Sequence, residues 1–184
     1  MYTPNLLGIL NIEKWQALQD ALAAATGMAI ITVDYKGVPV TLHSACRQFC
    51  QLVRTDEVLS KYCEKCDSRG GLEAIRQNRP YIYQCHFSIL DAAIPILVND
   101  RYVGAIMAGQ VLLSDEAEAL EPICVASSKA LLEKHTQQYE EYYAQLPKMT
   151  WNEVKTAVDL LFHLCNYVVS DAMEKSLLLS MMGD

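Results

Sequence analysis

The stretch DAAIPILVNDRYVGAIMAGQVLL, residues 91–113, consists of two apolar runs that flank Asn99-Asp100. Runs rich in β-branched and aromatic residues predict strands, and a polar dipeptide of this kind suits the tight turn of a hairpin. The preceding segment YIYQCHFSI, residues 81–89, has the same strand character. These residues predict three consecutive strands, which fix the middle of one antiparallel sheet.

The chain before this hairpin predicts a helix, two strands and a helical insertion. Asn11 is suited to cap a helix that Gly27 ends, because apolar residues repeat between them at helical spacing. Residues 28–44 predict a hairpin that turns at Lys36-Gly37. Residues 44–78 predict two or three short helices, in which Gly70-Gly71 marks a bend or a close approach.

The chain after the hairpin is expected to be helical. Ser114 opens an acidic helix start, and another helix is expected over residues 129–143. Thr150 and Glu153 form a capping box for a last helix over 151–182, about 48 Å long at 1.5 Å per residue. An apolar seam of 4-3-4-3-4 spacing follows it: Val154, Val158, Leu161, Cys165, Val168 and Ala172. This helix is expected either to pack along the domain or to form a dimer stalk or connector.

The order of elements predicts an α+β fold, with a five-stranded antiparallel sheet, inserted helices on one face and a long C-terminal helix. We divide the chain into a domain over residues 1–148 and a helical segment over 149–184. The overall balance, 52% hydrophobic and 20% charged residues among 184, is that of a globular protein.

Composition also limits the partners and the compartment. The formal charge of −7 argues against nucleic-acid binding through this segment, because phosphate contacts need clustered Lys and Arg. No apolar run reaches the roughly 18 residues of a membrane helix, and no signal peptide is recognisable at the N-terminus. We therefore expect a cytoplasmic protein whose seven cysteines are reduced thiols rather than disulfides.

Four cysteines form a candidate metal site. Cys50, Cys63, Cys66 and Cys85 are separated by 12, 2 and 18 residues, with His86 as a substitute ligand. Thiolates suit zinc or, alternatively, an iron–sulfur cluster. Two other interpretations stay open, namely that these thiols pack in the core or that they have a redox or catalytic role. The remaining cysteines, Cys46, Cys124 and Cys165, are expected to fill the core.

The sequence gives little support for an enzyme. It contains no HExxH, GxSxG, P-loop or GxGxxG motif. His86 is adjacent to Cys85, but neighbours on a strand point to opposite faces, so this histidine is poorly placed as the base of that thiol.

Five stretches taken together resemble one family. FCQLVR at 49–54, Cys63 followed by GGLEA at 70–74, YIYQCH at 81–86, IPILVNDRYVG at 94–104 and GQVLL at 109–113 are similar to the PocR sensory domain. The resemblance covers most of residues 5 to 170. It implies a PAS-like bacterial sensor of small hydrocarbon derivatives, such as 1,2- or 1,3-propanediol, joined to AraC-type DNA-binding domains, histidine kinases or other outputs.

The resemblance also bears on individual residues. The family carries cysteines at positions that match Cys50, Cys63 and Cys85, but a match to Cys66 is not part of the pattern. After the CH pair the family pattern is small-Gly-Leu, whereas this chain has Phe87-Ser88-Ile89. This departure implies a changed pocket or a different ligand.

A small diol requires an apolar pocket with a few placed polar groups. The strands offer His86, Ser88, Asp91 and Gln110 as ligand contacts, with Tyr83 and Met107 as walls. Gln110 is the first choice because an amide within an apolar strand is costly unless paired; a core amide bonded to backbone is its alternative. The function predicted is ligand sensing with relay to an output. The alternatives are a cysteine-metal redox or oxygen sensor and a structural dimerisation module, and we expect a homodimer through the last helix.

Overall fold

The computed structural model describes residues 10–115, 120, 122–124 and 136–182. A five-stranded sheet forms its centre, and four strands pair antiparallel in the order β1-β4-β3-β2: β1 Ala29–Asp34, β2 Tyr81–Gln84, β3 Leu90–Val98 and β4 Arg101–Leu113. The short β5, Lys148–Met149, pairs with β4 in parallel. The helices of the described residues are α2 Ile12–Thr26, α3 Gln48–Thr55, α4 Glu57–Gln77, α6 Thr136–Ala144 and α7 Trp151–Met182. The predicted α+β class is confirmed.

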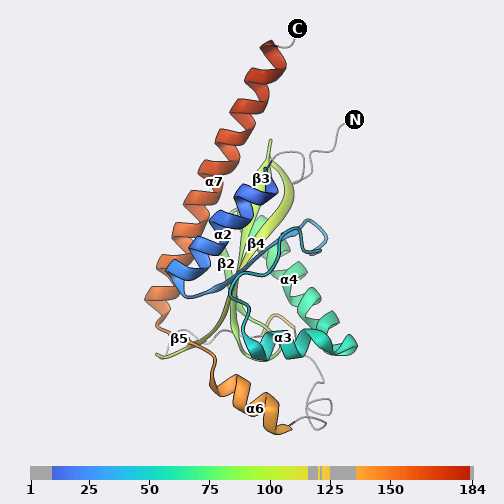
Figure 1. The fold of residues 1–184 in the computed structure, drawn as a ribbon, viewed down its shortest axis with the longest axis vertical. Helices are drawn as coiled ribbons and strands as arrows, with labels where there is room; N and C mark the ends of the chain where they lie inside the picture. The colour runs from blue at the N-terminus through green and yellow to red at the C-terminus, as the bar shows by residue number, and fades with distance from the viewer. Residues whose placement is uncertain (1–9, 116–119, 121, 125–135, 183–184) are drawn as a thin grey trace.

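Helices cover both faces of the sheet. α2 and α7 lie on one face, while the inserted helices α3 and α4, with α6, lie on the other (Figure 1). Because side chains alternate between the faces, Ala92 and Ile94 join the first core cluster and Ala93 joins the second. Burial on both sides explains why β3 and β4 are almost continuously apolar.

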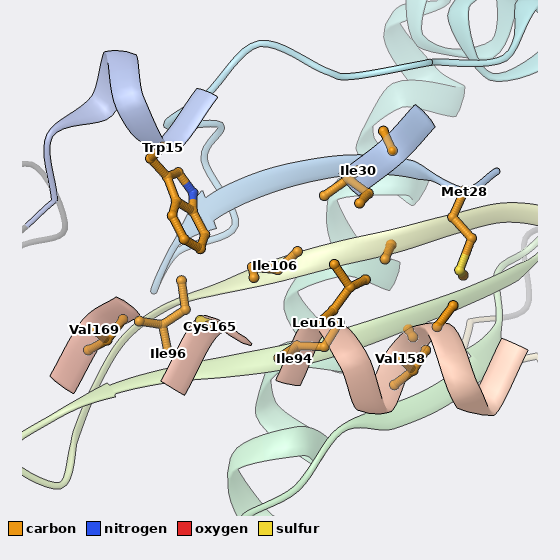
Figure 2. Packing of buried hydrophobic residues seen from close by; sticks show 14 of the residues in the cluster. Trp15, Met28, Ile30, Ile94, Ile96, Ile106, Val158, Leu161, Cys165 and Val169 are labelled. Carbon is orange, nitrogen blue, oxygen red and sulfur yellow. The ribbon is translucent and has the colours of Figure 1, made fainter. Parts of the chain in front are cut away.

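The first core cluster lies between α7, α2 and the sheet. Figure 2 shows Val158, Leu161 and Cys165 of α7 against Ile94 and Ile96 of β3. Trp15 of α2 closes the cluster from the other side, and its indole Nε1 donates to Thr32 Oγ1 at 2.8 Å. Cys165 is 1% exposed and packs as the sequence predicted.

The first predicted hairpin is only half regular. β1 and the turn at Lys36-Gly37 form as expected, but the returning residues 38–44 make isolated bridges, Val33 with Pro39 and Ile30 with Ser44. Pro39 has no N–H to donate to a ladder, which explains the interruption. The fifth strand of the sheet is therefore β5 rather than residues 38–44.

The helical insertion contains two helices, and α4 runs unbroken through Gly70-Gly71. The glycines mark a close approach and not a bend. A Cβ at Gly70 would lie 2.8 Å from Tyr83 Cζ, and one at Gly71 would overlap the Tyr102 hydroxyl. The absence of side chains lets α4 lie directly on β2 and β4.

The predicted helix ends are confirmed. Asn11 Oδ1 accepts the Lys14 N–H at 3.0 Å, and Gly27 ends α2 with φ +71°. At the start of α7, Thr150 N–H donates to Glu153 Oε2 at 2.7 Å, which completes the capping box with the Glu153 N–H to Thr150 Oγ1. Ser114 and Asp115, where a helix was expected to begin, form a bend, and its residues 116–119, like the part of 129–143 before Thr136, lie outside the described residues.

The α7 seam packs on the domain itself over its first half. Val154, Val158, Leu161 and Cys165 are buried, Val168 and Ala172 are half-buried, and residues 174–178 are exposed. The C-terminal turns of α7 extend beyond the sheet (Figure 1). The boundary at 148/149 stays a prediction, although the core includes α7 as far as Val169. Among the described residues, no helix is long and apolar enough to cross a membrane.

Candidate functional site: a cavity under the inserted helices

A cavity of about 30 Å³ lies between the sheet and the helices α3 and α4. Since a cavity of roughly 150 Å³ holds a benzene ring, this space has room for about one or two non-hydrogen atoms as it stands. Both apolar and polar side chains line it: Ala29, Ile31, His43, Phe49, Cys50, Val53, Arg54, Cys63, Cys66, Asp67, Cys85, His86, Phe87, Ile89, Asp91, Met107 and Gln110.

A β-bulge places two polar side chains at this cavity. Leu90 pairs with Val111 and Asp91 with Gly109, so Gln110 is the extra residue on β4. Gln110 has φ +61°, a left-handed conformation that costs about 1–2 kcal/mol for a residue other than glycine. A Cβ at Gly109 would lie 2.6 Å from Asp91 Cα, so the bulge requires glycine there. The backbone strain at Gln110 thus occurs where an amide and a carboxyl line the cavity.

The side chain of Gln110 holds the chain segment that precedes α3. Its Oε1 accepts the Arg47 backbone N–H at 2.7 Å, and its Nε2 lies 3.0 Å from His43 Nε2 and 3.7 Å from Cys46 Sγ. We call these contacts the Gln110 latch. Gln110 is 5% exposed. Its side-chain oxygen bonds to backbone, as in the alternative interpretation of Gln110 as a core amide.

Histidine 43 was not predicted as a site residue, because nothing in its sequence context marks it. Burial lowers the pKa of His43 to about 4, with a further contribution from the Arg54 charge. The imidazole is therefore neutral near pH 7. A neutral His43 Nε2 can accept a hydrogen bond from the Gln110 amide, with its own proton on Nδ1.

Two acids and one arginine form the charged part of the cavity. Arg54 Nη2 pairs with Asp67 Oδ2 at 3.0 Å, while Asp91 Oδ1 accepts the Gln110 backbone N–H at 3.2 Å. Burial raises the pKa of Asp91 well above its usual value, and the nearby Asp67 adds to this shift. Burial also raises the pKa of Asp67, against the effect of Arg54. Protein surrounds Asp91, yet its side chain keeps accessible surface at the cavity.

Some buried polar atoms around the cavity lack a partner among the described residues. They are Arg54 Nε, His86 Nδ1 and, behind the cavity wall, the Tyr83 hydroxyl. An unsatisfied buried donor costs about 1–3 kcal/mol. Two of these atoms belong to residues that line the cavity, so a polar ligand that reached them would recover part of this free energy.

All four predicted metal-site cysteines line this one cavity. Burial raises the pKa of Cys63 to about 12 and raises the pKa values of Cys50, Cys66 and Cys85 as well. In the described part of the chain, no three His, Cys, Asp or Glu side chains are grouped so that they could hold a metal ion. Metal binding by this set stays a prediction.

The structure pairs His86 with a cysteine other than its neighbour. Cys63 Sγ lies 3.4 Å from His86 Nε2, across 23 residues of sequence. Cys85 instead accepts the Phe87 backbone N–H through its sulfur at 3.4 Å. This geometry agrees with the argument from sequence that Cys85 and His86 are not partners. Nothing in the sequence indicated that Cys63 and His86 would be in contact.

The predicted ligand contacts divide into two groups. Gln110, His86, Asp91 and Met107 line the cavity, whereas Ser88 and Tyr83 do not. Ser88 occupies a turn after Cys85, with φ +58°, and its N–H donates to the Cys85 carbonyl at 2.9 Å. Tyr83 is 1% exposed and packs behind the cavity against Gly70 of α4.

Comparison with known proteins decides the family. The model of the sensory domain found in PocR matches residues 8–173. The chain belongs to the PocR sensory-domain family. It is 30% identical over 172 residues to the regulatory protein PocR of Salmonella typhimurium strain LT2. The alignment covers 91% of this chain and 53% of that relative, so the chain spans about half the length of the curated relative that it matches. No solved structure matches.

Membership in the PocR sensory-domain family gives the cavity its context. The chain is a signal-sensing domain of the kind found in a regulator. The segment Phe87-Ser88-Ile89, where the sequence resemblance implied a departure, lies at the site, since Phe87 and Ile89 line the cavity and Ser88 has a backbone conformation that glycine adopts without strain. Phe87 is held by the Phe49 ring, with ring centroids 5.1 Å apart.

Proposed function

We propose that this domain binds a small neutral hydrocarbon derivative, a diol or alcohol such as propanediol, in the cavity under α3 and α4. The observation that carries the proposal is the bulge, which places the Asp91 carboxyl at the cavity beside an apolar wall, while Gln110 holds the segment before α3. A neutral ligand is favoured because a buried carboxyl with a raised pKa can donate to a hydroxyl as well as accept from one. The space of about 30 Å³ is smaller than a three-carbon diol, so binding one would require α3 and α4 to move outward from the sheet.

Binding would reach the output through the sheet. Asp91 faces the cavity, while its two neighbours in the strand, Leu90 and Ala92, belong to the core cluster that includes α7. A ligand that favours one position of β3 would thus favour one position of α7. It shifts this equilibrium only by its difference in affinity for the two arrangements.

Thermal unfolding and calorimetry with 1,2- and 1,3-propanediol test the proposal. A ligand at about 100 times its Kd adds roughly 2.7 kcal/mol, which raises Tm by about 5–10 °C for a domain of this size. Asp91→Asn should keep the fold and weaken binding by about 10-fold or more. Asp100→Asn, in the exposed turn between β3 and β4, is the matched control and should bind normally.

The outcome that contradicts this proposal is clear. If short diols, alcohols and glycols all leave Tm unchanged, the cavity does not recognise this class. Metal analysis of the purified chain, with its absorbance spectrum, separately tests zinc or an iron–sulfur cluster on the four cysteines. A stoichiometric metal lost from Cys50→Ser would support the sensor based on thiol chemistry instead.

A further inference from the structure

The cavity contains a nucleophile beside a base, which hydrogen bonding to a diol does not require. Cys63 Sγ and His86 Nε2 are 3.4 Å apart, from α4 and from the residues that follow β2. Both residues line the cavity. This is the arrangement in which an imidazole removes the proton of a thiol as the sulfur attacks a carbon.

A second observation points to an absent electrophile or polar ligand at the same place. His86 Nδ1 is buried with no hydrogen-bond partner in the described part of the chain. If His86 Nε2 accepts from the Cys63 thiol, Nδ1 carries the ring proton and is a donor without an acceptor. Near the pair, Asp91 supplies a carboxyl that faces the same space.

We propose that Cys63 captures small aldehydes reversibly in this cavity as thiohemiacetals, with His86 as the general base. In the step, the Cys63 S–H bond breaks and a bond forms between Sγ and the carbonyl carbon. The C=O π electrons go to oxygen, which receives the proton from the imidazolium, so His86 ends neutral. No oxidant or reductant is consumed.

Burial of the cavity favours formation of a neutral thiohemiacetal over a reaction that leaves a charged product. A neutral thiol and a neutral aldehyde give a neutral adduct, so a desolvated site has no net charge to bury. The small volume favours the smallest aldehydes, and confinement beside Sγ supplies the proximity that a dilute thiol lacks. This inference rests on the proposed function, since it assigns a second ligand class to the same sensing cavity.

The test uses propanal labelled with ¹³C at its carbonyl carbon, added to the whole chain and followed by NMR. The expected result is a protein-bound signal of a saturated carbon bonded to oxygen and sulfur. Cys63→Ser should remove this signal and weaken propanal binding by about 10-fold or more. Cys165→Ala, which removes a thiol of the first core cluster on the opposite face of the sheet, is the control and should retain the signal. Cys63→Ala is the second variant, should Cys63→Ser not fold.

His86→Ala separates a base from a structural residue. A general base changes the rates of adduct formation and loss together, so this variant should slow both by about 100-fold, with the adduct population little changed. A purely structural role would change the population or the fold instead. Equal rates in the variant and the parent would overturn the role given to His86.

The same samples distinguish this inference from the proposed function. If Cys63→Ser keeps the diol-dependent rise in Tm but loses the propanal signal, the diol proposal and the covalent inference are both supported. A diol effect without any adduct overturns the covalent inference alone. An adduct without a diol effect overturns the diol proposal alone, and an adduct that persists in Cys63→Ser overturns the assignment to this thiol.

Discussion

At the scale of single residues, His43 makes the Gln110 latch sensitive to acid. A protonated His43 would present a donor to the Gln110 Nε2 donor, so the 3.0 Å contact exists only with neutral imidazole. The folded-state pKa of His43, about 4, lies below the unfolded value of 6.5, so the unfolded chain binds the proton more tightly. The contribution of His43 to stability is therefore present above pH 6.5 and is lost as the pH falls toward 4.

The measurement is the free energy of unfolding of the parent and of His43→Gln between pH 7 and pH 4. The difference between the two should shrink as the pH falls through this window. The parent must be compared with the variant because Asp67 and Asp91 affect the pH dependence in the opposite direction. Their raised pKa values favour the folded state in acid, and they do so equally in both proteins. A difference that is constant with pH would contradict the neutral latch.

Ser88 predicts a stabilising substitution. Its φ of +58° costs about 1–2 kcal/mol for a side chain with a Cβ, whereas glycine adopts it freely. After subtraction of the greater unfolded-state entropy of glycine, Ser88→Gly should raise the free energy of unfolding by about 0.5–1 kcal/mol. Ser60→Gly, within α4, is the control and should lower it by about 0.5 kcal/mol. Chemical denaturation of both variants checks the opposite signs.

These residues show why the site was only partly predictable. Gln110 was found because an amide in an apolar strand is costly and attracts notice, whereas Asp91 was named only as one of the polar groups that the strands offer. His43 and Asp67 reach the cavity from an irregular segment and from a helix, and no spacing rule connects them to it. The pair of Cys63 and His86 depends on how α4 lies over β2, which Gly70 and Tyr83 determine by contact rather than by pattern.

At the scale of elements, α7 is part of the core of the domain. Leu161 is 1% exposed against the sheet, whereas Leu160, one residue earlier, is 50% exposed. Leu161→Ala should cost about 2–5 kcal/mol because it removes a buried side chain and leaves a cavity. Leu160→Ala, the same substitution on the outer surface, should change the free energy of unfolding by less than about 0.5 kcal/mol. Urea unfolding of both variants compares them, and equal costs would contradict the observed orientation of α7.

The helical elements were the more predictable ones. Caps at Asn11, Gly27 and Thr150 act within a few residues, so the sequence alone locates the ends of α2 and the start of α7. The 4-3-4-3-4 seam of α7 could not reveal its partner, because a sheet and a second helix select the same apolar positions. The strand expected over 38–44 failed at Pro39, where one missing donor outweighed the local strand pattern.

At the scale of the whole molecule, the part of α7 beyond the sheet belongs to no core of the described domain. Residues 174–178 are exposed, and Tyr167, Leu178 and Met181 are 71%, 59% and 71% exposed on the same helix. Their spacing of 11 and 3 residues keeps them on one side of a coiled-coil helix. We expect this stripe to pair with that of a second copy of the chain, as predicted for the last helix.

Sedimentation of the full chain and of residues 1–173 over a range of concentrations tests this expectation. The shorter chain should stay folded, because its core side chains are all retained, and it should be monomeric. Leu178→Glu in the full chain should also weaken association, since it places a charge within the apolar stripe, whereas Ser176→Glu adds the same charge beside it and should have the smaller effect. A full chain that is monomeric at every concentration would exclude the dimer and favour the alternative, in which α7 serves as a connector.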